Sequence, residues 1–276
     1  MFKGFYTAAT GMIAQQRRTD MLTNNMANVN TPGFKADQAS LRAFPDILLS
    51  KMPGNYVPTE KGLRLPNQGP VGAVNTGVYV QEMTPNFIQG PLRDTSIQTD
   101  FALTNRVMPE VDGQAGSVFF NIEHPSGETY YSRNGNFTVD PEGFLTTGHG
   151  YFVLNDEGQR IQVNDANFQV TEDGFLRQNS DITNRLGISY AQDPNLLMRD
   201  GNGLFRTEDG ALPLAYGQEG VEFGIHQGSL EQSNVDSAKT MTELLSAYRS
   251  FEANQKILQA YDRSMDKAVN EIGRIG

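Results

Sequence analysis

The stretch NNMANVNTPGFKAD, residues 24–37, has four asparagines among its first seven residues. The pair Pro32-Gly33, which disfavours a helix, follows them. A helical spacing of apolar residues leads into this stretch and none leaves it, so we expect a helix to end here. Asparagine tolerates the left-handed conformation at a helix C-terminus, and its side chain both donates and accepts hydrogen bonds. A helix cap needs one or two such residues, so four asparagines exceed that need.

Both ends of the chain carry stripes of residues at alternating spacings of three and four, and most of these residues are apolar. Such narrow stripes are typical of coiled-coil seams. One stripe alone would more often cover a globular core, but two matching stripes at opposite ends predict helices that pair with each other. Polar residues interrupt both, which predicts a helix pair of marginal stability. The N-terminal stripe is Phe5, Ala8, Met12, Gln15, Thr19, Leu22, Met26 and Val29. The C-terminal stripe is Met241, Leu244, Tyr248, Phe251, Gln255, Leu258, Asp262, Met265, Val269 and Ile272.

Between these ends the chain changes to short alternating stretches separated by acidic turns that end in glycine. Glycine supplies the positive φ that such turns require. Asn134-Gly135, placed between Tyr131 and Phe137, is typical of a β-hairpin turn. The pattern predicts an antiparallel β domain of many short strands and hairpins. The acidic turns are Asp140–Gly143, Asp156–Gly158, Glu172–Gly174 and Glu208–Gly210.

The segment before this β domain is rich in proline and glycine. Leu41, Phe44, Ile47, Leu48 and Met52 fit one short helix, and the prolines and glycines that follow disfavour regular structure. We therefore expect a mainly β central domain with long N- and C-terminal helices that pair as a coiled coil. The expected divisions are an N-terminal helix over 1–30, an extended arm with a short helix over 31–75, an antiparallel β domain over 76–230 and a C-terminal helix over 231–276.

Composition narrows the classes of function. The formal net charge is −10: residues 1–30 carry +2 and residues 231–276 carry −1, so the middle carries −11. This negative charge would repel nucleic acid and anionic lipid. The absence of cysteine excludes disulfides, thiolate metal sites and cysteine nucleophiles. The first fifteen residues lack the apolar block of a signal peptide, and no run approaches membrane-spanning length. We expect no nucleic acid, no membrane insertion and no cleaved signal peptide.

The sequence shows no constellation typical of catalysis. His124, His149 and His226 have neither an acid nor a second histidine at ligand spacing, which favours structural or exposed roles. The acidic turns could supply a glycosidase carboxylate pair, but turn formation explains four similar turns better. Asp200-Gly-Asn202-Gly lacks the other ligands of a calcium loop, and no phosphate-binding or nucleophile-elbow motif is present. We expect no enzyme activity, cofactor, metal or small-molecule substrate.

Three motifs resemble the bacterial flagellar basal-body rod and hook proteins. YTAATGM at 6–12 and NNMANVNTPGFK at 24–35 are similar to the family's N-terminal signature. QGSLEQSNVD at 227–236 and YRSFEAN at 248–254 are similar to its last helix and the segment before it. YSRNGNF and the following residues, within 131–145, are similar to part of its β-domain core.

One region departs from the family pattern. Family members carry a compact Asp-Leu-Ala-Ile segment leading to Gly-Phe-Phe. Here Asp100-Phe-Ala-Leu103 is separated from Phe119-Phe120 by residues 104–118, so the surface of the β domain should differ near this insertion or divergence.

The resemblance implies a structural subunit whose terminal helices pair and pack against neighbours to form a tube. One β domain and a Pro/Gly-rich arm are similar to the distal-rod type, which transmits torque to the hook. Implied partners are copies of the chain, other rod and hook axial proteins, and the flagellar type III export apparatus. The implied location is the basal-body rod, where it crosses the periplasm or cell wall. Two other interpretations stay open: a β-rich cell-wall hydrolase and an adhesin-like binding module.

The expected assembly interface combines the helical stripes with the asparagine-rich stretch. Among the four asparagines, we expect some, Asn25 and Asn28 in particular, to bond backbone groups of a neighbouring subunit. The expected interface residues are Phe5, Ala8, Met12, Leu22, Asn24, Asn25, Met26, Asn28, Val29, Asn30, Phe34, Asn234, Met241, Leu244, Tyr248, Phe251, Asn254, Leu258, Met265, Val269 and Ile272.

Overall fold

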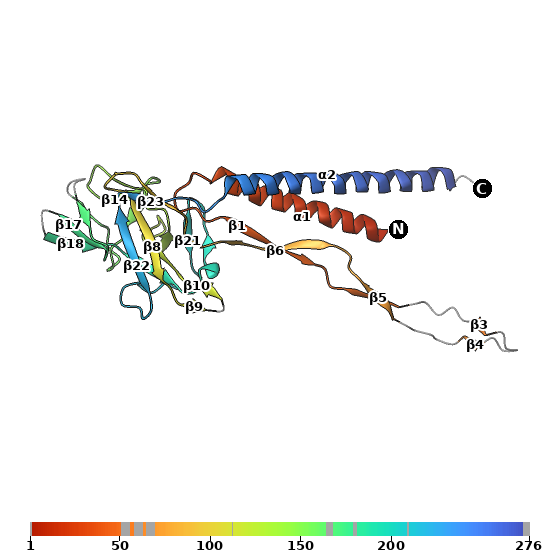
Figure 1. The fold of residues 1–276 in the computed structure, drawn as a ribbon, viewed down its shortest axis with the longest axis horizontal. Helices are drawn as coiled ribbons and strands as arrows, with labels where there is room; N and C mark the ends of the chain where they lie inside the picture. The colour runs from red at the N-terminus through yellow and green to blue at the C-terminus, as the bar shows by residue number, and fades with distance from the viewer. Residues whose placement is uncertain are drawn as a thin grey trace. The chain divides into compact units, whose positions relative to one another are not determined.

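The computed structural model confirms a mainly β chain with a long helix near each end (Figure 1). It describes residues 2–50, 56–57, 63–64, 70–111, 113–163, 168–178, 181–208 and 210–272. The chain divides into two compact units, described separately below. The helical unit comprises Met1–Asn24, Gln38–Met83 and Ala238–Gly276, and the β unit comprises Asn25–Asp37 and Thr84–Ser237. In the described ranges, neither helix is long and apolar enough to span a membrane.

The two long helices are slightly shorter than the sequence predicts. Helix α1 spans Phe2–Ala27 and ends in the asparagine-rich stretch, where the chain continues in successive turns. Helix α2 spans Ser237–Lys267 and is followed by a π-helical segment at Ala268–Ile272. It begins after residue 231 because strand β23, Ser229–Glu231, pairs with strand β7, Leu92–Asp94.

The arm between α1 and the β unit consists of paired strands, so the predicted short helix is wrong. Phe44 precedes Pro45, which disfavours helical geometry at that position, and the Phe44 N–H instead donates to Gly77 O at 3.0 Å. Met52 lies outside the described residues. The antiparallel pairs are β2 (Ile47–Ser50) with β5 (Pro70–Val74) and β3 (Tyr56–Val57) with β4 (Leu63–Arg64), and β1 (Asp37–Ala43) pairs with β6 (Val78–Pro85).

The β unit is built around an eight-stranded sheet in the order β13-β14-β15-β11-β12-β21-β20, with β19 also paired to β11. Its strands are β11 (Ser117–Glu123), β12 (Thr129–Ser132), β13 (Phe137–Val139), β14 (Leu145–Thr147), β15 (Phe152–Val153), β19 (Ile188–Ala191), β20 (Met198–Arg199) and β21 (Leu204–Arg206). The other described strands are β8 (Phe101–Val107), paired with β22 (Glu222–Gln227); β9 (Glu110–Val111), paired with β10 (Gln114–Ala115); and the sheet of β16 (Gln169–Val170), β17 (Phe175–Gln178) and β18 (Asp181–Arg185). A 3-10 turn, η1, spans Pro194–Leu196.

Aromatic and aliphatic side chains from distant strands form the core of the β unit. Phe101 of β8, Phe120 of β11 and Phe137 of β13 are almost fully buried, and the Phe120 and Phe137 rings meet edge-to-face at 5.1 Å. Because β8 pairs with β22, more than a hundred residues later, this core requires most of the chain to be present.

The glycine turns were predicted correctly in kind, but the Asn134-Gly135 hairpin was not. Gly143 and Gly174 adopt positive φ, as the acidic-turn pattern predicts. Strand β12 pairs with β11 and β21 rather than with β13, so no hairpin forms across Gly135. Gly135 instead accepts from Phe101 N at 2.9 Å, and a Cβ there would collide with Phe101 O. The glycine is needed for this close backbone approach.

Gly33 marks the place where the chain after α1 crosses the β unit. Its φ is +69°, and a Cβ there would lie 2.5 Å from the carbonyl carbon and oxygen of Arg133. Its N–H donates to Glu231 O at 2.8 Å. Both the backbone conformation and the available space therefore require glycine.

We expect Gly33→Ala to destabilise the β unit by more than about 3 kcal/mol, because it combines left-handed strain with overpacking against rigid backbone. Gly127→Ala is the matched control, since Gly127 has φ +83° but no atom of the described residues lies within 4 Å of the place that a Cβ would take. The control should lose about 1–2 kcal/mol from strain alone. Urea unfolding followed by circular dichroism measures both; equal losses would contradict the assigned crossing.

Candidate functional site

The two terminal helices pack against each other through a row of positions on α2 that alternate by four and three. Leu244, Phe251, Leu258 and Met265 belong to this half-buried row, as the sequence predicts. The alternate positions lie one residue earlier than predicted. The buried or half-buried row is Thr240, Leu244, Ala247, Phe251, Asn254, Leu258, Tyr261, Met265 and Ala268.

Small residues on α1 face this row. A Cβ at Gly4 would collide with the Tyr261 hydroxyl, and a Cβ at Gly11 would lie 3.1 Å from Asn254 Nδ2. The two glycines are one heptad apart, so they let large α2 side chains approach the α1 backbone. Nearer the other end of α1, Met21 and Leu22 pack with Ala247. Sequence reasoning missed these glycines because it searched for apolar side chains alone.

The remaining predicted interface residues divide by exposure. Met241, Tyr248 and Val269 are exposed by 48%, 51% and 72%, so they lie outside the helix–helix contact. The side chain of Ile272 lies outside the described residues. Ala8 and Leu22 of α1 are buried. The half-buried members are Phe5, Met12, Met26, Asn28, Val29, Phe34, Asn234 and Asn254.

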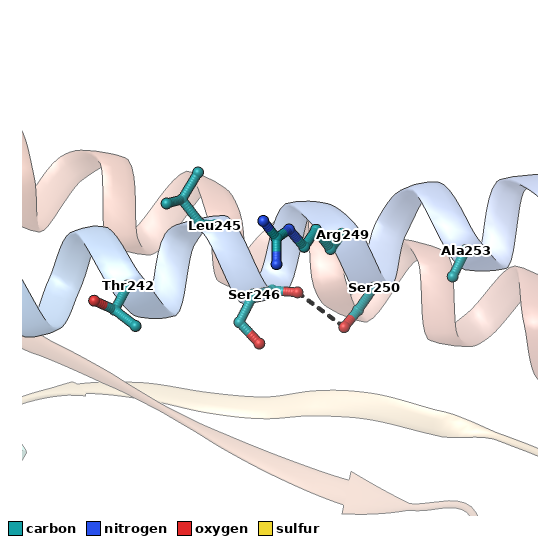
Figure 2. A pocket seen from close by; sticks show the side chains of 6 residues that line it. All are labelled: Thr242, Leu245, Ser246, Arg249, Ser250 and Ala253. Carbon is teal, nitrogen blue, oxygen red and sulfur yellow. Dashed lines mark hydrogen bonds between the residues drawn. The ribbon is translucent and has the colours of Figure 1, made fainter.

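One face of α2 is lined by small and polar side chains together with Leu245. A shallow groove of about 420 Å³ lies along this face. Figure 2 shows the side chains that line it. Ser250 Oγ donates to Ser246 O at 2.9 Å, which keeps this hydroxyl on the helix. The lining residues are Thr242, Leu245, Ser246, Arg249, Ser250 and Ala253.

The asparagines at the end of α1 form more hydrogen bonds within the chain itself than the sequence predicts. Asn25 is buried, donates from Nδ2 to Asp37 O and accepts from Asp37 N, both at 2.9 Å. Both polar atoms of its amide are therefore bonded within the chain, and its predicted bond to a neighbouring subunit stays a prediction. Asn28 Oδ1 accepts from Thr31 Oγ1 at 3.1 Å. Asn24 and Asn30 are exposed, and their place in an interface stays a prediction.

Glu231 fixes the segments on both sides of the β unit. Its Oε1 accepts from Lys35 Nζ at 2.7 Å and from Gly90 N at 2.9 Å, and its Oε2 accepts from Arg133 Nε at 2.8 Å. All three charged side chains are at most 1% exposed. We refer to Lys35, Arg133 and Glu231 as the buried ion cluster. Sequence reasoning missed it, although Lys35 and Glu231 lie inside the two terminal motifs.

Both cations of the buried ion cluster also donate to backbone carbonyl groups. Lys35 Nζ donates to Ile88 O at 2.9 Å. Arg133 donates to Val118 O at 2.7 Å and to Leu103 O at 3.1 Å. A buried charge group is tolerated when pairing and hydrogen bonding compensate its desolvation, and this group meets that condition.

The electrostatics follow from this geometry. Burial, reinforced by the Arg133 charge and partly offset by Glu231, lowers the pKa of Lys35 to about 8. Burial alone would raise the pKa of the Glu231 carboxyl, but Arg133 and Lys35 outweigh it and hold that pKa below its usual range. Glu231 is therefore ionised at neutral pH, and two cations share its charge.

Two further side chains tie the same segments together. Asn234 Oδ1 accepts from Ala36 N at 2.7 Å, and its Nδ2 donates to Asn86 O at 2.8 Å. Arg199 donates to Asp37 Oδ2 at 2.8 Å and to Lys35 O at 2.9 Å. Residues 33–37 and 229–235, which we call the two connectors, are thus bonded to each other and to the rest of the β unit.

The buried ion cluster and the asparagine and arginine contacts around it hold segments of the chain together, and they present no reactive group to a substrate. Among the described residues, no group of three or more His, Asp or Glu side chains is placed to hold a metal ion. The cations and the carboxylate of the buried ion cluster are covered by protein, so they are closed to a substrate.

Comparison with known proteins decides the family. Residues 5–35 match "Flagella basal body rod protein", residues 115–180 match "Flagellar hook protein FlgE/F/G D1 domain", and residues 226–271 match "Flagellar basal body rod FlgEFG protein C-terminal". The chain is 44% identical to the flagellar hook-basal body complex protein FlhO of Bacillus subtilis, over the full length of both proteins. The chain belongs to the flagellar basal-body rod and hook protein family.

Other relatives span the whole chain as well. The chain is 30% identical to the flagellar basal-body rod protein FlgF of Caulobacter vibrioides, with 100% of each covered. It is 32% identical to the rod protein FlgG of Borreliella burgdorferi, with 98% of each covered. The family is structural and non-enzymatic, which confirms that the chain is not an enzyme and removes the hydrolase interpretation. The three matched regions contain Lys35, Arg133 and Glu231 respectively, so each member of the buried ion cluster lies within a matched region.

We expect Glu231→Gln to destabilise the β unit by about 3–5 kcal/mol, because it leaves two buried cations without a countercharge. Glu123→Gln is the matched control: Glu123 pairs with Arg160 at 2.6 Å, but its side chain is 25% exposed and that of Arg160 is 48% exposed. The control should change stability by less than about 1 kcal/mol. Urea unfolding monitored by circular dichroism gives both values, and similar values would contradict the role assigned to Glu231.

Lys35 should make stability rise with pH. Its pKa is about 8 in the folded chain and 10.5 as an ordinary lysine, so between these values the unfolded chain binds more protons. The free energy of unfolding should therefore increase from pH 8 toward pH 10, by roughly 1.4 kcal/mol for each pH unit. Lys35→Met should remove this increase, whereas Lys239→Met, on the exposed surface, should retain it. An unchanged pH slope in Lys35→Met would contradict the assignment.

Proposed function

We propose that the chain is a subunit of the distal part of the flagellar basal-body rod. In this proposal copies of the chain and other axial proteins assemble through their terminal helices into a tube that transmits torque to the hook. Family membership supports the structural role, and the FlhO, FlgF and FlgG relatives support a place in the basal body. One β unit together with the arm of β1–β6 supports the distal type.

The observation that carries this proposal is the apolar surface that the paired helices leave exposed. Tyr6 and Ile13 on α1 are 61% and 50% exposed, and Leu245 on α2 is 47% exposed. Met241 and Tyr248 extend the α2 surface by one turn. Apolar side chains spaced along helices at this exposure are typical of surfaces that become covered on association. Burying each one contributes about 1.5–3 kcal/mol.

We further propose that α1 and α2 form a two-stranded coiled coil. The alternation of four and three along the half-buried row of α2 supports this geometry, because it repeats every seven residues. The seam contains polar groups: among the described residues, Gln15 Oε1 is buried without a hydrogen-bond partner. Such a seam limits the stability of the pair alone and favours further packing among subunits.

Helical growth follows if the exposed face of one subunit meets a different face of the next. A contact between different patches that does not close into a ring produces a helical filament. The predicted use of the flagellar type III export apparatus belongs to the same proposal. The deciding genetic experiment deletes the gene for this chain from its source bacterium. A strain that still builds hook and filament would contradict a distal-rod role.

We expect Leu245→Glu to weaken assembly at least about tenfold while leaving the helix content of the monomer unchanged, because it places a charge on an apolar contact surface. Ile182→Glu, at a residue of the β unit that is 58% exposed, adds the same charge elsewhere and should assemble normally. Sedimentation of purified protein and swimming of complemented deletion strains measure the effect. Normal swimming of the Leu245→Glu strain would contradict the proposed interface.

A further inference from the structure

Three sequence motifs that the structural role does not use meet at one surface of the β unit. They are the turn beginning at His124, the turn Gly148-His149-Gly150 and the loop Asp200-Gly-Asn202-Gly. None of the three indicates a binding site by its sequence alone, and the fold brings them together around Tyr151. The aromatic patch, as we call this surface, consists of His124, Tyr130, His149, Tyr151, Asp200 and Asn202.

The strand register explains two of these approaches. Glu123 at the end of β11 pairs with Thr129 of β12 and with Phe152 of β15. The turn after β11 and the turn before β15 therefore lie at the same end of the sheet. The third loop, between β20 and β21, reaches the patch through its side chains.

The rings of the aromatic patch are ordered by contact with one another. His124 stacks on Tyr130 with ring centroids 4.3 Å apart and planes 25° apart. Tyr151 lies 5.7 Å from His124 and 6.3 Å from His149. Tyr130 is buried, His124 and Tyr151 are half-buried, and His149 is exposed. Flat ring surface is thus held in a fixed arrangement at the boundary with solvent.

Polar groups border these rings. Asn202 Nδ2 donates to the Tyr151 hydroxyl at 3.3 Å, and burial together with the nearby Asp200 carboxylate raises the pKa of the Tyr130 hydroxyl. Ser126 Oγ lies 3.0 Å from His124 Nδ1. The patch therefore offers amide, hydroxyl, imidazole and carboxylate groups beside aromatic rings.

The loop that supplies Asn202 has an uncommon backbone. Gly201, Asn202 and Gly203 all have positive φ, at +85°, +49° and +74°. Left-handed residues normally occur singly, and asparagine is the non-glycine residue that tolerates the conformation best. A run of three is a conformation that folding must hold in place, and such backbone tends to occur where a side chain is being presented.

We propose that the aromatic patch binds an uncharged oligosaccharide through the Tyr151 ring and the polar groups of Asn202 and Asp200. The negative face of an aromatic ring attracts the polarised C–H bonds on the flat side of a pyranose ring. Amide and carboxylate groups at the ring's edge match the donors and acceptors of sugar hydroxyls. The inference concerns the β unit alone and does not require the chain to assemble.

The charges around the patch favour this ligand over others. The charged groups that act on Tyr130 are Asp200, Glu128 and Arg206, so the carboxylates outnumber the cation and an anionic ligand is disfavoured. Among the described residues, no three His, Asp or Glu side chains lie together in an arrangement that could hold a metal ion. A metal is therefore disfavoured as the ligand. Exposed polar groups among the rings also distinguish the patch from an apolar protein contact.

The test is a titration of the isotope-labelled full-length chain with chitotetraose, followed by NMR signals of the histidine imidazoles and tyrosine rings. We expect saturable shifts for His124, His149 and Tyr151. Tyr151→Ala should abolish them, and Tyr151→Phe should retain them because it keeps the ring. Asn202→Gly keeps the left-handed backbone but removes the amide, and should weaken binding by about threefold to tenfold.

Leu196→Ala is the control, since Leu196 is an exposed residue of the same unit, 67% accessible. It should bind like the unaltered chain. Absence of saturable shifts in the unaltered chain would overturn the proposal. So would equal binding by Tyr151→Ala or Asn202→Gly. Because Asn202→Gly needs no change in the fold, the test does not depend on the stability of Tyr151→Ala.

Discussion

The structure depends on one carboxylate, Glu231, and on its complete removal from water. It accepts from Lys35 on the connector after α1, from Arg133 in the β unit and from the Gly90 backbone. A buried carboxylate is stable when it has such partners, and each cation is stable when the carboxylate is present. The cluster therefore forms as a whole or not at all. Since its members come from residues 35, 133 and 231, the connectors are locked when the β unit folds.

This constraint gives the family's terminal motifs a physical meaning. The Thr31-Pro32-Gly33-Phe34-Lys35 segment carries a glycine where no Cβ fits and a lysine that reaches Glu231. The Asn25 side chain donates to Asp37 O, and the Asn234 side chain accepts from Ala36 N. These bonds pair backbone groups that helices and strands leave unpaired. Helices α1 and α2 continue from these fixed points. In the proposed assembly, their exposed apolar side chains form the surface that meets other subunits.

Sequence periodicity predicted the two helices, their pairing face in part and the β class of the middle. It misplaced half of the α2 row because Met241 and Tyr248 are apolar but exposed, whereas the residues that replace them, Thr240 and Ala247, are buried. The predicted helix after residue 40 failed because strand pairing, a nonlocal interaction, decides those residues. The asparagines were identified as hydrogen-bonding groups, but their partners depend on the fold. The buried ion cluster was invisible for the same reason: nothing local pairs a lysine with a glutamate 196 residues later.

Amide hydrogen exchange on the monomer tests most directly whether the buried ion cluster locks both connectors into the β unit. Gly33 N, Asp37 N and Gly90 N donate to Glu231 O, Asn25 Oδ1 and Glu231 Oε1 respectively. If the connectors are locked, these three amides should exchange as slowly as those of β11 in the core of the sheet. Exchange of the three at the faster rate of exposed loops, while β11 stays protected, would show that the connectors open independently and would contradict the account.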